Sequence, residues 1–199
     1  MTGRESLFSA HDLTVRIAHK SEIGWMLHRH YLGKWPGVTT ALVALCRRDV
    51  PVGCIVFALP PRETSQRYGG ETWELARLWV DDSEPRNTES WFLSRTVKLI
   101  RRLCPTVRFL VSYADPSVGH QGTIYKAANW RYDGRTDEER KTPRFDYLCD
   151  GKHYSRRAHV PAGRPVERVP RVSKARYVLA LRRLGSGSGS LRPTVEAAA

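Results

Sequence analysis

The sequence predicts a mixed α/β fold, in which a central, largely antiparallel sheet is flanked by helices. Two β-rich runs, at 38–46 and 52–57, surround a turn at Asp49 and Pro51, which is typical of an antiparallel hairpin. Apolar side chains repeat at helical spacing between Phe92 and Leu103. The chain has 199 residues and 41% of them are hydrophobic, so it can build the core of a single domain.

The first half of the chain alternates between strand and helix signals. The run from Leu13 to Ile17 alternates apolar and polar side chains as a strand does, and Ser21 is placed to cap a helix that reaches Tyr31. The hairpin follows. Residues 71–80 then predict a further strand, in which Trp73, Leu75 and Trp79 are prominent.

The second half continues the alternation. Asn87 or Thr88 can cap a helix that runs to Leu103, where Pro105 stops it. A strongly β-type run at 107–113 and a short helix at 121–130 come next. Two short strands are expected to finish the sheet, and a strand-like run follows them; these segments are residues 131–135, 145–149 and 175–181.

Positive charge is concentrated near the C-terminus. The formal net charge is +13, and residues 152–183 hold ten Lys or Arg against Glu167 alone, which is +9 of that total. Such a charge favours a polyanionic partner, most commonly a nucleic acid, although a generic basic protein is the alternative. We expect residues 152–184 to form a basic extension that contacts DNA through Arg156, Arg157, Lys174 and Arg176.

The ends of the chain and its cysteines indicate the limits of the domain and the cellular compartment. Residues 1–184 are expected to form one domain, followed by a flexible Gly-Ser linker at 185–190 and a disordered tail that ends at residue 199. The four cysteines form no C-x-x-C pair and lie in or beside apolar runs, as expected of reduced core thiols in a cytosolic protein. No segment is apolar enough for a signal peptide or a membrane span.

The segment from Gly122 to Trp130, followed by Gly134, is similar to the last helix of the GNAT family of acyl-CoA transferases. The order of the elements resembles that family too, which implies a sheet splayed near Val80 and Tyr113 and acetyl-CoA or a related acyl donor. The chain departs from the family after residue 80, because the segment 81–90 lacks glycine and is rich in acids.

Backbone N–H groups cradle a pyrophosphate where small residues let the chain approach it. The acids after residue 80 oppose such binding, and these are Asp81, Asp82, Glu84 and Glu89. A reduced anion site remains at the start of the helix, where Arg86 lies beside Asn87 and Thr88. These three residues are our candidates for binding the donor.

Two blocks within residues 74–130 resemble the Mom family of phage proteins more closely. The first is Glu74-Leu-Ala-Arg-Leu-Trp-Val-Asp-Asp-Ser83 with the run at 85–90, and the second joins Ser112-Tyr-Ala-Asp-Pro116 to the run at 119–130. The resemblance implies a transferase that converts the N6 amine of adenine in duplex DNA to a carbamoylmethyl (acetamido) form. That modification protects phage DNA from restriction enzymes in the host cytoplasm. Iron is also connected with the family.

Four residues are candidates for catalysis, each with a structural alternative. Asp115 precedes Pro116 at the end of a strand, where it can orient an amine or can merely cap a turn. Tyr125 can act as a general acid or can pack in the core. Arg77 can stabilise negative charge or can lie on the outer side of its strand, and Ser90 can line the pocket or cap a helix.

His30 and Tyr31 match a His-Tyr pair of the Mom family, and with Asp115 they offer N and O ligands that suit non-haem iron. Without a metal, these groups act as acid, base or orienting residues. Adenine N6 is stacked and paired in a duplex, so the base must be flipped out or already exposed. Trp35, Trp130 and Tyr132 are the candidates for stacking on it, and the sequence does not choose among them.

Two other functions remain open. A GNAT N-acyltransferase acting on a small amine or a protein would share the fold, but it would be expected to carry a glycine-rich phosphate turn. A non-catalytic DNA-binding protein would share the charge, but it would not need Arg77, Asp115 and Tyr125 among apolar neighbours. The oligomeric state is also open, with a homodimer as one option.

Overall fold

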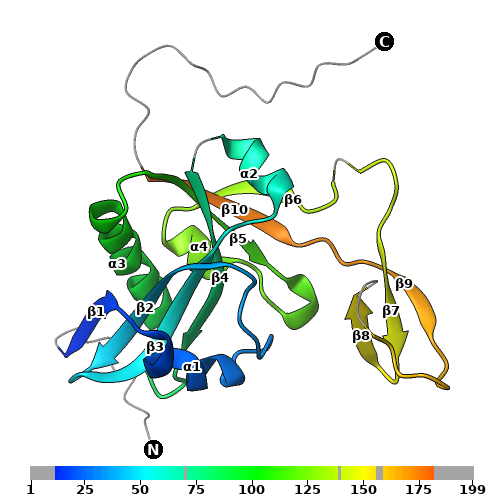
Figure 1. Ribbon diagram of the computed structural model, residues 1–199, viewed down its shortest axis with the longest axis horizontal. Coiled ribbons are helices and arrows are strands. Elements are labelled where there is room, and N and C mark those ends of the chain that lie inside the picture. The colour runs from blue at the N-terminus through cyan, green and yellow to red at the C-terminus, as the bar shows by residue number, and fades with distance from the viewer. Residues whose placement is uncertain (1–11, 70, 139, 156–158, 182–199) are drawn as a thin grey trace, which may run out of the picture.

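The structure is a computed structural model that describes residues 12–69, 71–138, 140–155 and 159–181. Its centre is a seven-stranded sheet in the order β1-β2-β3-β4-β5-β10-β6 (Figure 1). The strands are β1 (Leu13–Ile17), β2 (Thr39–Arg47), β3 (Val50–Ala58), β4 (Glu71–Val80), β5 (Val107–Ala114), β6 (Arg131–Arg135) and β10 (Ala175–Ala180). Only β4 and β5 pair in parallel, so the predicted mixed, largely antiparallel sheet is confirmed.

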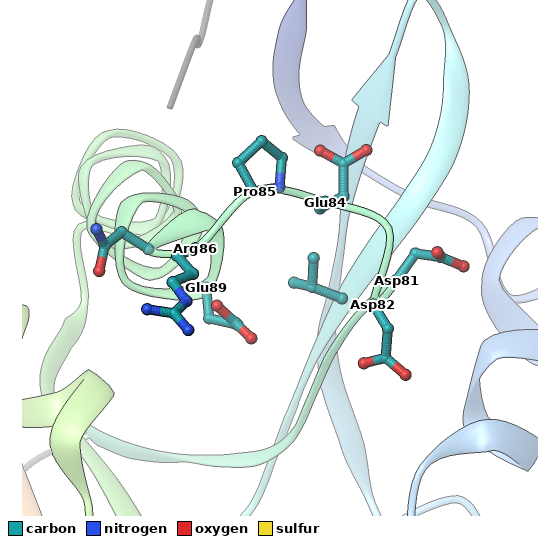
Figure 2. Close-up of a pocket in the computed structure, with 8 residues that line it drawn as sticks. Asp81, Asp82, Glu84, Pro85, Arg86 and Glu89 are labelled. Atoms are coloured by element: carbon teal, nitrogen blue, oxygen red, sulfur yellow. The ribbon is translucent and has the colours of Figure 1, made fainter. Parts of the chain in front are cut away.

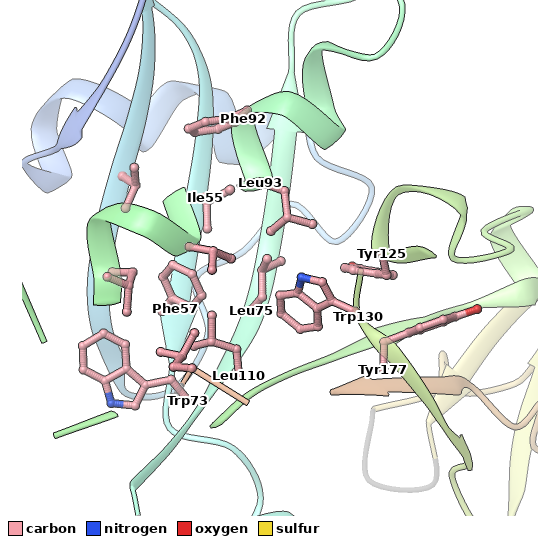
Figure 3. Close-up of a cluster of buried hydrophobic side chains, with 14 of the residues drawn as sticks. Ile55, Phe57, Trp73, Leu75, Phe92, Leu93, Leu110, Tyr125, Trp130 and Tyr177 are labelled. Carbon is pink, nitrogen blue, oxygen red and sulfur yellow. The ribbon is translucent and has the colours of Figure 1, made fainter. Parts of the chain in front are cut away.

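Helices cover both faces of this sheet because its central strands are apolar on both sides. In β3, Ile55 and Phe57 pack in a cluster with α3 (Thr88–Leu103), whereas Cys54 and Val56 face α1 (Lys20–Arg29). Figure 3 shows the first cluster, in which Phe92 and Leu93 of α3 lie over the sheet. The same cluster continues through Tyr125 and Trp130 at α4 (Thr123–Ala127) to Tyr177 of β10.

The sheet opens between β4 and β5. Their registered pairs run from Glu71 with Val107 to Glu74 with Val111, although β4 continues to Val80 and β5 to Ala114. β3 stays paired with β4 as far as Val80, so it is β5 that turns away. This geometry confirms the splay expected near Val80 and Tyr113.

A second, three-stranded sheet corrects the expected role of residues 145–149. These residues form β7 (Phe145–Cys149), which pairs with β8 (Lys152–Ser155) and β9 (Glu167–Pro170) to one side of the main sheet (Figure 1). The place predicted for β7 in the main sheet is taken by β10, whose Tyr177 and Val178 are buried. Part of the expected basic extension is therefore a core strand.

Two helix ends also differ from the prediction. α1 begins after His19, because the Glu22 carboxylate accepts a hydrogen bond from the His19 N–H at 2.6 Å; Ser21 lies within the first turn. α4 begins only after Gly122, which has a left-handed φ of 74°. α2 (Arg62–Tyr68) and the 3-10 turn η1 (Pro116–Val118) were not anticipated.

Three further expectations concern the cysteines, membrane-spanning helices and the C-terminal linker and tail. All four cysteines are free and three of them are buried, as expected of core thiols. Within the described ranges, none of the helices has the length and apolar character that a bilayer crossing requires. The expected linker and tail lie outside the described residues.

Candidate active site

Polar side chains from four segments meet where β4 and β5 part. Tyr31 follows α1, Asp115 ends β5, His120 follows η1, and Lys174 precedes β10. The rings of Tyr31 and His120 lie 5.2 Å apart, and Lys174 Nζ lies 2.8 Å from Asp115 Oδ2. His120 N–H also donates to the Asp115 carbonyl oxygen at 3.1 Å. Tyr31 and Lys174 lie 143 positions apart in the sequence, as their residue numbers show, and the fold brings them to the same place.

Asp115 has the capping role that the sequence allowed, and its second oxygen is paired with a cation. Its Oδ1 accepts hydrogen bonds from the Ser117 N–H at 3.0 Å and the Ser117 hydroxyl at 2.5 Å, so it caps η1. Its Oδ2 faces Lys174. Burial alone would raise the pKa of Asp115, but the hydrogen bonds from Lys174 and Ser117 hold it below its usual range. The carboxylate is therefore a charged, orienting acceptor.

His30 lies beside this cluster as a neutral imidazole. Its ring stacks obliquely on Tyr31 at 4.4 Å, and its Nδ1 accepts a hydrogen bond from the Leu32 N–H at 3.1 Å. Burial, aided by the charges of Arg77 and His120, lowers the pKa of His30 to about 4. In the neutral ring, an accepting Nδ1 assigns the proton to Nε2. His30 is then a hydrogen-bond donor toward a ligand.

Arg77 is on β4 and is only 9% exposed. Its Nε donates to the Lys34 carbonyl at 3.1 Å and its Nη1 donates to the Ala76 carbonyl at 2.6 Å. Arg77 therefore fastens the segment after α1, which carries Tyr31, to the central strand. Its charge also acts on His30 and Tyr31.

Tyr125 closes the inner side of the opening. The Ser112 hydroxyl lies 2.9 Å from the Leu75 carbonyl and 2.8 Å from the Tyr125 hydroxyl. Because a hydroxyl has one proton and a carbonyl can only accept, Ser112 donates to Leu75 and the phenol of Tyr125 donates to Ser112. Burial raises the pKa of Tyr125 to about 12, so the phenol keeps its proton at neutral pH.

Glu74 is the functional candidate that the sequence prediction missed. It occupies the last registered pair before β4 and β5 diverge. Burial raises the pKa of Glu74, although the charges of Arg77 and Lys174 act in the opposite direction. A signal was present, because Glu74 is a lone acid within an apolar strand, just as Arg77 is a lone base there. No comparable local signal marks His120 or Lys174.

The residues chosen for donor binding lie elsewhere, around a hollow of about 380 Å³ between β4 and the start of α3. Arg86 and Asn87 line it and are exposed. Thr88 does not suit direct contact, because it is fully buried and its hydroxyl donates to the Pro85 carbonyl at 2.6 Å. The Ser90 hydroxyl donates to the Asn87 carbonyl at 3.0 Å, and α3 has no side-chain cap hydrogen bond, so Ser90 does not have the capping role.

The acids around this hollow are partly neutralised. Arg47 binds Glu84 through two hydrogen bonds, at 3.0 and 2.7 Å, and Arg29 lies 3.6 Å from Asp81. Figure 2 shows Glu84 on the opposite side of the loop from Asp82. Asp82 and Glu89 are left to oppose a pyrophosphate, against Arg86 and the N-terminal N–H groups of α3. The hollow therefore fits an anionic donor weakly.

The proposed iron ligands are neighbours, but their donor atoms do not fit a metal ion. Nδ1 of His30 already accepts a backbone hydrogen bond, Asp115 faces the ammonium of Lys174, and burial raises the pKa of Tyr31. A cation at this place would compete with Lys174 and would require a deprotonated phenol. Within the described part of the chain, no three His, Cys, Asp or Glu side chains gather as a metal site.

The four residues expected to contact DNA are divided. Arg156 and Arg157 lie outside the described residues. Lys174 belongs to the active-site cluster through Asp115. Arg176 is held inside the fold, since its Nε and Nη2 donate to the Asp133 carbonyl at 3.0 and 2.7 Å and its side chain is only 12% exposed. Because these donors are occupied by Asp133, we do not propose Arg176 as a contact to DNA.

Comparisons with known proteins fit this architecture. The model of the Mom protein family matches residues 12–183. A curated relative, the methylcarbamoylase mom of Escherichia phage Mu, is 43% identical over 81 residues, which are 41% of this chain and 31% of the relative. The match thus spans less than a third of that relative.

Solved structures share the fold at low sequence identity. A GNAT family acetyltransferase from Elizabethkingia anophelis with acetyl-CoA bound has a TM-score of 0.54 at 12% identity, covering 85% of this chain and 99% of that one. A Bacillus subtilis acetyltransferase in complex with CoA has a TM-score of 0.53 at 12% identity, covering 84% and 98%. The expected GNAT-like fold is thereby confirmed.

Proposed function

The chain belongs to the Mom protein family, and we propose that it is a phage DNA-modifying transferase that acts on adenine N6 in duplex DNA. In this proposal the product is the carbamoylmethyl (acetamido) adenine, which protects phage DNA from restriction enzymes in the host cytoplasm. The observation that carries the proposal is the cluster of Tyr31, Asp115, His120 and Lys174 at the opening of the sheet. A domain that only binds DNA has no need of these groups.

The exocyclic amine of adenine is a poor nucleophile, so it must be oriented and relieved of a proton. Asp115, charged and fixed by Lys174 and Ser117, is suited to accept a hydrogen bond from the amine. The pKa of Glu74 is raised by burial and that of Asp115 is lowered, so Glu74 is the stronger base of the two. We assign orientation to Asp115 and proton removal to Glu74.

The leaving group requires a proton at the end of the transfer. Tyr125 holds one at its hydroxyl, because burial keeps its pKa near 12. In the resting structure that proton is donated to Ser112, so the Tyr125 hydroxyl must turn away from Ser112 before it can protonate a leaving group. His30 Nε2 supplies a second, neutral donor on the other side of Tyr31, where it can stabilise negative charge that develops on an oxygen.

The donor proposed is acetyl-CoA or a related acyl thioester, which would supply an activated carbon. Two features support it. The acetyltransferases of the same fold were solved with acetyl-CoA or CoA, and Arg86 lines a hollow at the N-terminus of α3. Acetyl transfer would bond N6 to a carbonyl carbon. A carbamoylmethyl group instead bonds N6 to a methylene carbon that bears a carboxamide, so its donor must be one that supplies an activated methylene already carrying that carboxamide, with release of the donor's leaving group.

Mass spectrometry of nucleosides tests the function. Plasmid DNA from cells that express the chain should contain an adenine whose mass identifies the added group. Asp115→Ala should lower its level by about 100-fold, which is the usual loss when a reacting group is no longer held in position. The matched control is Glu63→Gln, an exposed carboxylate on α2.

The outcomes separate the three functions. Unmodified DNA together with acetylation of small amines or proteins would favour a GNAT N-acyltransferase. Unmodified DNA with salt-sensitive DNA binding would favour a non-catalytic protein. A folded Asp115→Ala variant with full modification would remove Asp115 from the mechanism.

A further inference from the structure

A second hollow, of about 510 Å³, lies beside α4, β6 and β10. The side chains that line it include Lys126, Arg135, His120 and Gln121, together with the rings of Tyr132 and Tyr177. No carboxylate is among its described lining residues. Its size is within the range of small-molecule sites, which is about 300–1,000 Å³.

The two hollows differ in charge. The hollow at the start of α3 is lined by four carboxylates and Arg86, whereas the one beside α4 is lined by Lys126 and Arg135 without an opposing acid. Phosphate oxygens are attracted to the second and repelled by most of the first. A phosphorylated ligand that also has an aromatic group is therefore best matched by the hollow beside α4.

An exposed ring stands in this hollow on a rigid support. Tyr132 is 50% exposed, and its ring meets that of buried Tyr177 edge-on at 5.8 Å. Tyr177 stacks on Tyr125 at 5.2 Å, and its hydroxyl donates to the Gln121 carbonyl at 3.2 Å. A ring fixed in this way is a platform on which a nucleobase can stack with little loss of side-chain entropy.

The hollow adjoins the active-site cluster. His120 lines it, contacts the ring of Tyr31, and is hydrogen-bonded to the carbonyl of Asp115. Ala175, another lining residue, directly follows Lys174. The hollow therefore shares His120 with the active-site cluster and extends to the residue that follows Lys174.

We propose that this hollow binds an adenine nucleotide swung out of the DNA duplex. The base stacks on Tyr132, the Gln121 carboxamide donates to and accepts from the adenine edge, and Lys126 and Arg135 hold the flanking phosphates. DNA as the source of the nucleotide rests on the proposed function, whereas the site itself rests on the hollow. The other two candidate rings are less suited, since Trp130 is 4% exposed and Trp35 is covered by Lys20 at 4.7 Å.

Base extrusion can be measured without activity. The probe is a duplex in which 2-aminopurine replaces one adenine, because its fluorescence rises when the base leaves the stack. The full chain should raise that fluorescence, and Tyr132→Ala should weaken both the signal and the affinity for dAMP by about tenfold. Trp25→Ala is the matched control, an aromatic 45% exposed on α1.

Two further variants test the charges and the base edge. Lys126→Ala should lower the salt slope of duplex binding by about one, as the loss of one phosphate contact does, whereas Lys98→Ala on α3 should not. Gln121→Leu should reduce the preference for dAMP over dCMP more than it reduces affinity for either. Unchanged binding in folded Tyr132→Ala and Lys126→Ala variants would overturn the proposal.

The remaining outcomes test the nucleotide-binding hollow and the proposed DNA modification separately. A Tyr132-dependent signal with unmodified plasmid DNA would support the site and reject the proposed chemistry. Modified DNA with a Tyr132→Ala variant that extrudes the probe normally would support the chemistry and reject the site. Displacement of dAMP by CoA but not by duplex DNA would assign the hollow to the donor, and this would also overturn the proposal.

Discussion

At the scale of single residues, His30 links the active site to stability. In the folded chain burial and the charges of Arg77 and His120 lower the pKa of His30 from 6.5 to about 4. Between pH 6.5 and pH 4, His30 is protonated in the unfolded chain but stays neutral in the folded chain. Stability should therefore fall as the pH falls from 6.5 toward 4, by about 2 kcal/mol from this residue.

His30→Asn is the variant that isolates this effect. Its side-chain oxygen can still accept the Leu32 N–H, but it does not titrate. Urea unfolding at pH 7 and pH 5 should show a smaller acid loss in the variant than in the parent. His28→Asn, an exposed histidine of α1, is the control, and an equal acid loss in all three proteins would contradict the assignment.

Individual site residues could be predicted from the sequence where a charge interrupts an apolar strand or ends one. Arg77 and Asp115 were found in this way, and Glu74 carries the same signal. Lys174 could not be placed, because its partner Asp115 lies 59 positions earlier, as their residue numbers show, and β10 brings the two together only in the folded sheet. Arg176 appeared free for DNA for the same reason: its acceptor, Asp133, lies on a neighbouring strand.

At the scale of elements, the turn before α4 sets the position of Tyr125. Gly122 has a φ of 74°, and a Cβ built on it would lie 2.3 Å from the ring of Tyr177. Gly122→Ala should destabilise the fold by about 3 kcal/mol, through left-handed strain and the displacement of that ring. Gly119→Ala is the matched control, because its φ is 79° but its Cβ would meet nothing within 4 Å.

Thermal unfolding of the two glycine variants separates strain from clash. Gly119→Ala should cost only about 1 kcal/mol, which is the strain alone. Gly122→Ala should also weaken adenine modification, since Tyr177 stacks on Tyr125. Equal melting temperatures for the two variants would show that the ring of Tyr177 moves aside without cost.

The junction of β6 and β10 depends on a half-buried carboxylate. Asp133 lies 3.2 Å from Arg176 Nε and accepts a hydrogen bond from the Tyr68 hydroxyl at 2.6 Å. Arg176→Ala should cost about 2–3 kcal/mol, because it removes two hydrogen bonds to the part-buried Asp133 carbonyl. Arg67 and Arg131 still face the Asp133 carboxylate. Arg131→Ala, whose side chain is 70% exposed, should cost less than about 1 kcal/mol.

Chemical denaturation of these two arginine variants checks the order of the costs. A stable Arg176→Ala variant that has lost DNA affinity would contradict the structural role and restore Arg176 as a DNA contact. Equal costs would show that solvent screens both pairs alike.

Local patterns predicted which segments are strands better than they predicted which strands pair. The bounds of β1, β4 and β6 agree with the prediction, because each is a short run with its own alternation or composition. β7 was assigned to the wrong sheet. Its pairing with β8 and β9 depends on contacts distant in sequence, which periodicity does not encode.

At the scale of the whole molecule, the two hollows differ in charge and therefore suit different ligands. Most of the net charge of +13 is carried by the C-terminal third, yet the loop that would hold a donor's phosphates is acidic. Asp82 and Glu89 are the acids there without a described salt bridge. A chain that is basic in its C-terminal third thus presents acids to a polyanionic donor, and the donor's affinity should depend on these two residues.

The double variant Asp82→Asn, Glu89→Gln should bind acetyl-CoA about fivefold more tightly than the parent at low ionic strength. Each neutralised surface carboxylate removes about 0.5 kcal/mol of repulsion, and the gain should shrink as added salt screens it. Calorimetric titration at two salt concentrations measures both effects, with Glu63→Gln as the control for a change in net charge. An unchanged affinity at low salt would mean that the donor's phosphates do not lie against the start of α3. The donor would then either bind elsewhere or lack the nucleotide, and the acidic loop would serve to exclude it.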